Sequence, residues 1–265
     1  MPELPDHVPI NRQRTPCATK NDKLGWKDGF SLKLEGISFG VRSNSPQLLS
    51  RLKALFPAHA TDDDTKEVEI LLSFMEGGET GRKGTLNYHL VYDAWNRVAR
   101  TLEFDEAIAA FESTIKARVA TLSKEKTYLD AAVVAWGDRA VMVVGETEQR
   151  QELVDAMVAQ GGTSYCGQAV LDENQRLESC GASAGPSLAP ALAVFAEKAE
   201  SKKPRQVKLT PARTALELFR HARAARFLPQ KTLSTLANLS QNLAAYQARV
   251  GPPADLARFV QRQLG

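Results

Sequence analysis

The chain has few of the residues that reveal a chemistry or a cellular compartment. Its 265 residues include three cysteines, at positions 17, 166 and 180, and their wide, odd spacing forms neither a zinc motif nor a disulfide framework. We therefore expect a reducing, cytoplasmic setting, with Cys166 as a buried, inert thiol. No apolar run approaches the roughly 20 residues of a membrane span. The polar, proline-punctuated start has no apolar signal-peptide core, so we expect neither Sec-type export nor a membrane partner.

Patterns typical of metal ligands are missing as well. The four histidines, at positions 7, 59, 89 and 221, are far apart, and none forms a short metal-binding pair. A net charge of +3 does not by itself indicate an anionic partner. We therefore expect no metal site and no resident cofactor.

What the chain does have is an ordinary globular composition, with 43% hydrophobic and 25% charged residues. A chain of this length can bury a large core or two smaller ones. The pattern predicts an irregular arm over 1–27, a small α+β domain over 28–122, and a larger α/β core over 128–265 that is closed by C-terminal helices. The predicted fold class is therefore α/β or α+β.

Local patterns support this division. Apolar residues alternate over 30–34 and 37–41, with Glu35-Gly36 between them, which predicts a hairpin. Ser45-Pro46 and Thr210-Pro211 each place a capping hydroxyl before a proline, which is typical of a helix start. A spacing of three to four residues predicts a helix over 104–122. Further expected segments are strands at 131–136, 140–144 and 163–171, and helices at 186–199, 229–248 and 253–264.

The most informative segment is the strand, turn and helix that follow residue 140, because it has the outline of a phosphate-binding loop. A working loop needs Gly-x-x-x-x-Gly-Lys-Ser/Thr, so that backbone amides and the lysine hold phosphate and the hydroxyl holds magnesium. Counted from Gly145, the second glycine is Arg150, the lysine is Gln151 and the hydroxyl residue is Glu152. Glu146 adds a carboxylate where phosphate would bind. The strand–turn–helix pattern is kept, but the residues that would bind phosphate and magnesium are missing.

Three passages together resemble the HPr kinase-related proteins, whose core is shared with phosphoenolpyruvate carboxykinases. They are Tyr128-Leu129-Asp130-Ala131-Ala132-Val133 with Val143-Val144-Gly145, then residues 159–172 (AQGGTSYCGQAVLD), then residues 243–251 (LAAYQARVG). Residues 37–46 (ISFGVRSNSP) are similar to the start of the N-terminal domain in some of these proteins. The resemblance covers about residues 30–265 and implies a kinase-like α/β core behind a small N-terminal unit.

The resemblance also shows what this chain has lost. An active member would use the loop lysine and hydroxyl, an acidic pair for magnesium and base chemistry, and often a histidine on the first strand. Here those positions are Gln151, Glu152, Gly167-Gln168 and Asp130. We therefore expect no catalytic residues. The resemblance implies a catalytically inactive HPr kinase-like protein that scaffolds or regulates a protein partner, or an oligomer of itself.

Two alternatives remain open. The chain could be an atypical active kinase or phosphohydrolase with displaced ligands, in which Asp130 or Asp172 is the base and ATP and magnesium are cofactors. It could instead bind an anion or nucleic acid through residues 198–231, where ten basic residues against two glutamates leave a net charge of +8. The expected contact face there consists of Arg213, Arg220, Arg223 and Arg226.

Overall fold

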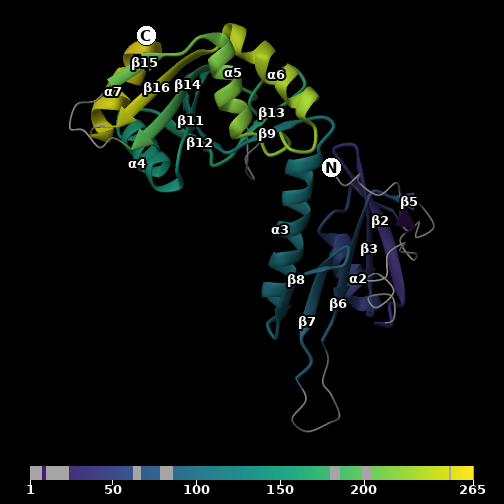
Figure 1. The fold of residues 1–265 in the computed structure, drawn as a ribbon. Coiled ribbons are helices and arrows are strands. Elements are labelled where there is room, and N and C mark those ends of the chain that lie inside the picture. The colour runs from purple at the N-terminus through teal and green to yellow at the C-terminus, as the bar shows by residue number, and fades with distance from the viewer. Residues whose placement is uncertain are drawn as a thin grey trace. The chain divides into compact units, whose positions relative to one another are not determined.

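The chain contains two compact units, which are described separately. In the computed structural model they are unit 1 (Met1–Val119) and unit 2 (Ala120–Gly265). The structure describes residues 8–9, 24–61, 67–77, 86–179, 186–198, 205–250 and 252–264. Both units combine helices with sheets (Figure 1), so the fold is α/β or α+β, as the sequence predicts.

The expected boundaries can be set beside this division. The sequence places the joint at 123–127, and the structure divides the chain after Val119, within the last turns of helix α3 (Phe104–Leu122). Of the irregular arm expected over 1–27, the structure describes residues 8–9 and 24–27. Residues 8–9 are a short strand, β1 (Val8–Pro9), which pairs with β5 (Glu67–Val68).

Unit 1 is built on a six-stranded sheet with the order β4-β2-β3-β6-β7-β8. Among the described strands of this sheet, only β3 and β6 run parallel to each other. Helix α2 lies in the connection between these two strands. The strands and the helix are β2 (Asp28–Leu34), β3 (Ile37–Ser43), α2 (Pro46–Ala54), β4 (Ala60–Thr61), β6 (Ile70–Met75), β7 (His89–Asp93) and β8 (Asn96–Thr101). The predicted hairpin of β2 and β3 is confirmed.

Capping and aromatic packing fix the helices of unit 1. The Ser45 hydroxyl accepts a hydrogen bond from the Leu48 backbone N–H at 3.3 Å, as expected for an N-cap. Helix α3 covers β6 and β7: the Phe74 ring lies 6.0 Å from that of Phe111, and Arg118 pairs with Asp93. The helices therefore close one face of the sheet over a buried aromatic core.

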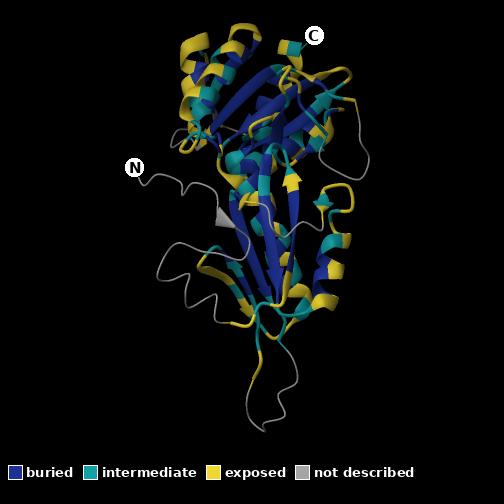
Figure 2. Cartoon of the chain, turned by 90° about the vertical axis from the view of Figure 1, so that its right-hand side faces the viewer, coloured by how far each residue is buried: buried dark blue, intermediate teal, exposed yellow. Residues whose placement is uncertain are grey.

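Unit 2 is a three-layer sandwich around a sheet with the order β12-β10-β11-β14-β16-β15. Its central strands β11, β14 and β16 are parallel to one another. Helices α4 and α7 cover one face and α5 and α6 the other, with the central strands buried between them (Figures 1 and 2). The strands of this sheet are β10 (Ala131–Trp136), β11 (Arg139–Val144), β12 (Thr163–Cys166), β14 (Ala189–Lys198), β15 (Arg205–Lys208) and β16 (Ala244–Val250).

The remaining elements of unit 2 complete its two outer layers. A separate two-stranded sheet pairs β9 with β13. These elements are β9 (Thr127–Leu129), α4 (Thr147–Val158), β13 (Ala169–Leu171), α5 (Pro211–Arg220), α6 (Pro229–Asn242) and α7 (Pro253–Leu264). In the part of the chain that is described, no helix is both long and apolar enough to cross a membrane.

Three expected segments of unit 2 were wrong. The helix expected over 186–199 is not formed, because β14 occupies 189–198 in the middle of the sheet and residue 199 lies outside the described residues. The helix expected over 229–248 ends at Asn242, and 244–248 belong to β16. The strand expected over 163–171 is two strands that belong to different sheets. Alanine-rich segments have a good helix propensity, but β14 pairs with β11 on one side and β16 on the other, and this pairing overrides it.

Candidate functional site

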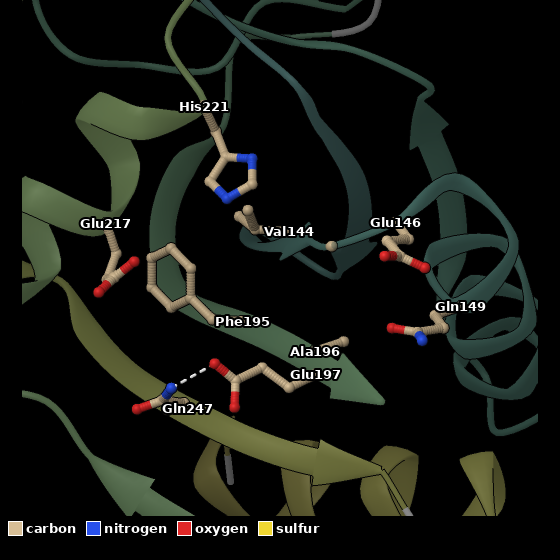
Figure 3. A pocket seen from close by; sticks show the side chains of 10 residues that line it. Val144, Glu146, Gln149, Phe195, Ala196, Glu197, Glu217, His221 and Gln247 are labelled. Atoms are coloured by element: carbon tan, nitrogen blue, oxygen red, sulfur yellow. Dashed lines mark hydrogen bonds between the residues drawn. The ribbon is translucent and has the colours of Figure 1, made fainter. Parts of the chain in front are cut away.

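A pocket of about 430 Å³ opens at the carboxyl ends of the parallel strands of unit 2 (Figure 3). Strand β11 brings Val144 to its wall, β14 brings residues 195–197, and β16 brings Gln247. The first turn of α4 and the last turn of α5 close the sides. In open α/β sheets ligands commonly bind at this edge, because several loops and helix ends converge there. The pocket is therefore the candidate site.

Gly145 is needed at the floor of the pocket for packing. A side-chain carbon there would lie 2.9 Å from the Ala196 backbone oxygen, closer than real contacts allow, and 3.3 Å from the Ala196 Cβ, which is a tight contact. The absence of a side chain thus lets the end of β11 lie against β14. This explains the first glycine of the loop pattern without any phosphate.

The turn from β11 to α4 is too short to cradle phosphate. Strand β11 ends at Val144 and α4 begins at Thr147, so Gly145 and Glu146 are the whole connection. A phosphate loop instead exposes several successive backbone amides before its helix begins. Here the Arg150 amide already donates to the Glu146 carbonyl at 2.9 Å, as part of the helix.

Only two of the five expected loop residues line the pocket, Gly145 and Glu146. Arg150 donates from its guanidinium to the Asp130 carbonyl oxygen at 3.3 Å, and Gln151 donates to the Asp155 carboxylate at 2.8 Å. Glu152 is exposed on α4. The three side chains at the positions of the second glycine, the lysine and the hydroxyl residue therefore do not take part in the site.

The pocket wall is acidic. The carboxylates of Glu146, Glu197 and Glu217 line it, with no lysine or arginine among its lining residues. Glu146 is the N-cap of α4, but its side chain makes no capping hydrogen bond. The Gln247 amide of β16 donates to the Glu197 carboxylate of the neighbouring strand β14 (Figure 3). Neutral polar groups and the Phe195 ring complete a surface that is negative overall.

Helix α5 positions two of the lining groups, Glu217 and His221. Glu217 is held by Arg220 at 3.0 Å and by Arg213 at 3.7 Å. Burial lowers the pKa of His221 from its usual 6.5, which outweighs the opposite effect of the neighbouring Asp130 and Glu217 carboxylates. His221 therefore presents a neutral imidazole to the pocket at neutral pH.

The two aspartates considered as bases lie outside the pocket. Asp130 follows β9 and pairs with Arg223 at 2.8 Å, with both side chains about half exposed. Asp172 follows β13 and accepts the Arg176 backbone N–H at 2.8 Å, which closes a local turn. Neither carboxylate lines the pocket.

The expected arginine face is divided by the end of a helix. Arg213 and Arg220 lie on α5, whereas Arg223 and Arg226 lie in the turns that follow it. Two carboxylates, Glu217 and Asp130, pair with three of the four guanidinium groups. The four arginines therefore do not form one helical stripe, and their charge is partly neutralised.

Sequence reasoning missed most of the pocket wall, including Phe195, Glu197 and Gln247. All three lie on β14 and β16, the segments that were expected to be helical. A correct strand assignment would have supplied the signal, because Glu197 is a polar residue at the carboxyl end of β14 and Gln247 is a polar residue within the neighbouring parallel strand β16. His221 was considered only as a metal ligand, and its distance in sequence from the other histidines gave no signal for a site.

The structure also bears on the predictions for Cys166 and for metal binding. Cys166 is buried, as expected, but it is disulfide-bonded rather than a free thiol. Within the described ranges, no group of three or more histidine, cysteine or acidic side chains is arranged to hold a metal ion.

No protein-family model matches the sequence, and no curated protein matches it.

Proposed function

We propose that this chain is a catalytically inactive protein with an HPr kinase-like core, which acts as a scaffold or regulator by binding a protein partner. The observation that carries the proposal is the two-residue turn between β11 and α4. It leaves a strand–turn–helix frame without the amide cradle that a P-loop phosphotransferase uses.

The charge of the pocket supports the same conclusion. Two like unit charges about 4 Å apart repel by roughly 1 kcal/mol in water and about 4 kcal/mol in partly shielded surroundings. A triphosphate placed here would meet the carboxylates of Glu146 and Glu197 without a lysine to offset them. Nucleotide affinity should therefore be lower than that of a working site by several factors of ten.

The alternative of an active enzyme has less support. Asp130 is held by Arg223 and Asp172 by a local turn, and neither carboxylate faces the pocket. A general base must come within hydrogen-bond reach of the group from which it takes the proton. We therefore assign neither aspartate a catalytic role.

Calorimetric titration with ATP and magnesium at near-physiological salt tests the proposal. We expect no detectable heat of binding up to millimolar nucleotide, and no transfer of labelled phosphate to HPr or to the chain itself. A Glu146→Gln/Glu197→Gln double variant is the informative control, since removing the two charges should only raise anion affinity. Micromolar ATP binding by the natural chain, or phosphate transfer at ordinary efficiency, would overturn the proposal.

A further inference from the structure

Strand β8 leaves one edge of the unit 1 sheet open. It is the last strand in the order and pairs only with β7 among the described residues. The backbone N–H and C=O groups along its outer side thus form a row that another strand can pair with. Extended segments of partner proteins bind at such edges by adding a strand.

Large apolar side chains concentrate along this edge. Trp95 is 47% exposed, Val98 45% and Leu102 48%, and all three lie within eight consecutive residues. A register shift in the pairing of β7 with β8 leaves Val98 without a partner residue on β7. Tryptophan often provides the largest share of binding energy at protein interfaces. The edge therefore combines open backbone groups with apolar contact surface.

The hairpin that presents Trp95 is held in a conformation that costs energy. Ala94 has a φ of 54°, a left-handed conformation that a non-glycine residue adopts at a cost of about 1–2 kcal/mol. Two contacts hold the turn in place: the Ala94 amide donates to the Leu71 carbonyl at 2.8 Å, and Asp93 pairs with Arg118 of α3 at 2.6 Å. These two contacts position the turn that carries Trp95.

The charge of the edge is basic. Arg97 lies opposite Tyr92 and Arg100 opposite Leu90, and because these β7 residues are two apart, both arginines lie on the same face. The Arg100 guanidinium stacks 4.0 Å from the centre of the Tyr88 ring. Among the described residues neither arginine has a carboxylate partner. Two guanidinium groups beside an open strand edge complement an acidic strand.

We propose that the outer edge of β8 binds an extended, acidic segment of a partner protein by strand addition. Backbone hydrogen bonds along β8 supply affinity, and alternate side chains supply specificity. Acidic residues of the partner strand pair with Arg97 and Arg100, and apolar residues pack on Trp95 and Val98. The inference rests on the proposed function only in taking a protein as the partner. An open strand edge fits a polypeptide backbone, and a nucleic acid has no strand to add.

Selection from a phage-displayed library of random eight-residue peptides tests the proposal with the full chain as bait. We expect the enriched peptides to alternate apolar with acidic residues. The affinity of a synthetic enriched peptide, measured by fluorescence polarisation, should fall at least tenfold in an Arg97→Glu/Arg100→Glu variant. An Arg258→Glu/Arg262→Glu variant makes the same change in net charge on the exposed side of α7, far from β8 along the chain, and it should bind as the natural chain does.

Hydrogen exchange distinguishes strand addition from binding by charge attraction alone. The amides of β8 should gain protection when the peptide is added. Enrichment of peptides without acidic residues, equal binding by both double variants, or protection confined to other strands would each overturn the proposal. So would a dimer on light scattering with β8 already protected, because a second copy would then occupy the edge. ATP binding bears on the proposed inactivity alone and leaves this test unaffected.

Discussion

The Ala196 backbone oxygen lies 2.9 Å from the point that a side-chain carbon on Gly145 would occupy. This close approach joins the ends of two parallel strands at the floor of the pocket. Gly145 is therefore fixed by packing, and its place at the start of a loop-like pattern does not require a phosphate ligand.

Replacing Gly145 by alanine should destabilise unit 2. The added carbon must displace backbone of β14, and such overpacking costs roughly 1–3 kcal/mol. Gly167→Ala is the matched control, since a carbon there meets nothing within 4 Å, and its effect should stay within about 0.5 kcal/mol. Urea unfolding of both variants measures the difference. Equal stability of the two variants would contradict the packing explanation.

Removing the carboxylate of Asp130 should have a small effect. Its ion pair with Arg223 has side chains that are 46% and 47% exposed, and pairs of this kind contribute about 0–1 kcal/mol. Asp130→Ala should therefore change the unfolding free energy little more than Asp138→Ala, a change in an exposed turn. ATP and p-nitrophenyl phosphate hydrolysis should stay at background in both variants. Turnover in the natural chain that only Asp130→Ala abolishes would revive the enzyme hypothesis.

The Asp93–Arg118 pair should be worth more than other ion pairs of unit 1. The Asp93 side chain is 12% exposed and accepts from Arg118 Nε at 2.7 Å. Arg118→Met leaves this carboxylate unpaired and should cost roughly 1–3 kcal/mol, less than for a fully buried pair because Arg118 is partly in water. Lys116→Met removes the exposed pair with Glu112 on the same helix and should cost below about 0.5 kcal/mol.

Hydrogen exchange locates that effect. Arg118→Met should also speed exchange of the amides around the hairpin of β7 and β8, because the pair ties the end of β7 to α3. Exchange that is equally fast in both helix variants would mean that the pair does not hold the hairpin.

His221 should make unit 2 sensitive to mild acid. Burial lowers its pKa from 6.5, so between that value and the folded pKa the unfolded chain binds a proton that the folded chain does not. The free energy of unfolding should therefore fall as the pH drops through about 6.5, and the loss should level off below the folded pKa. His221→Gln should flatten this part of the profile.

Two measurements check that prediction. Urea unfolding at several pH values compares the natural chain with His221→Gln. An NMR titration, in which the variant assigns the His221 ring signal, should give a midpoint below 6.5. A midpoint at or above 6.5 would show that the carboxylates of Asp130 and Glu217 outweigh burial.

Local signals were enough to predict elements whose limits are set by nearby residues. The Ser45 hydroxyl accepts a hydrogen bond from the Leu48 backbone amide, and the Thr210 hydroxyl accepts one from the Arg213 backbone amide. Helices α2 and α5 start at the prolines that follow these two caps. The alternating hairpin of β2 and β3 is similar, because its register follows from a two-residue turn. Each of these signals lies within a few residues of the structure that it predicts.

The candidate site could not be predicted in the same way. Strand β14 becomes a strand by pairing with β11 and β16, and Val194 lies opposite Val143 on one side and Tyr246 on the other. No local pattern in an alanine-rich segment records partners so distant in sequence. Residues of these three strands line the pocket, so Phe195, Glu197 and Gln247 were missed together with β14 and β16.

The parallel core also sets an order of events during synthesis. Val194 of β14 pairs with residues that lie about fifty positions before and after it in the chain, and contacts between such distant residues form slowly. One edge of this central, apolar strand has no partner until residues 244–250 have been made. The growing chain therefore passes through a stage in which one edge of this apolar strand is exposed, and a chaperone would be most useful at that stage.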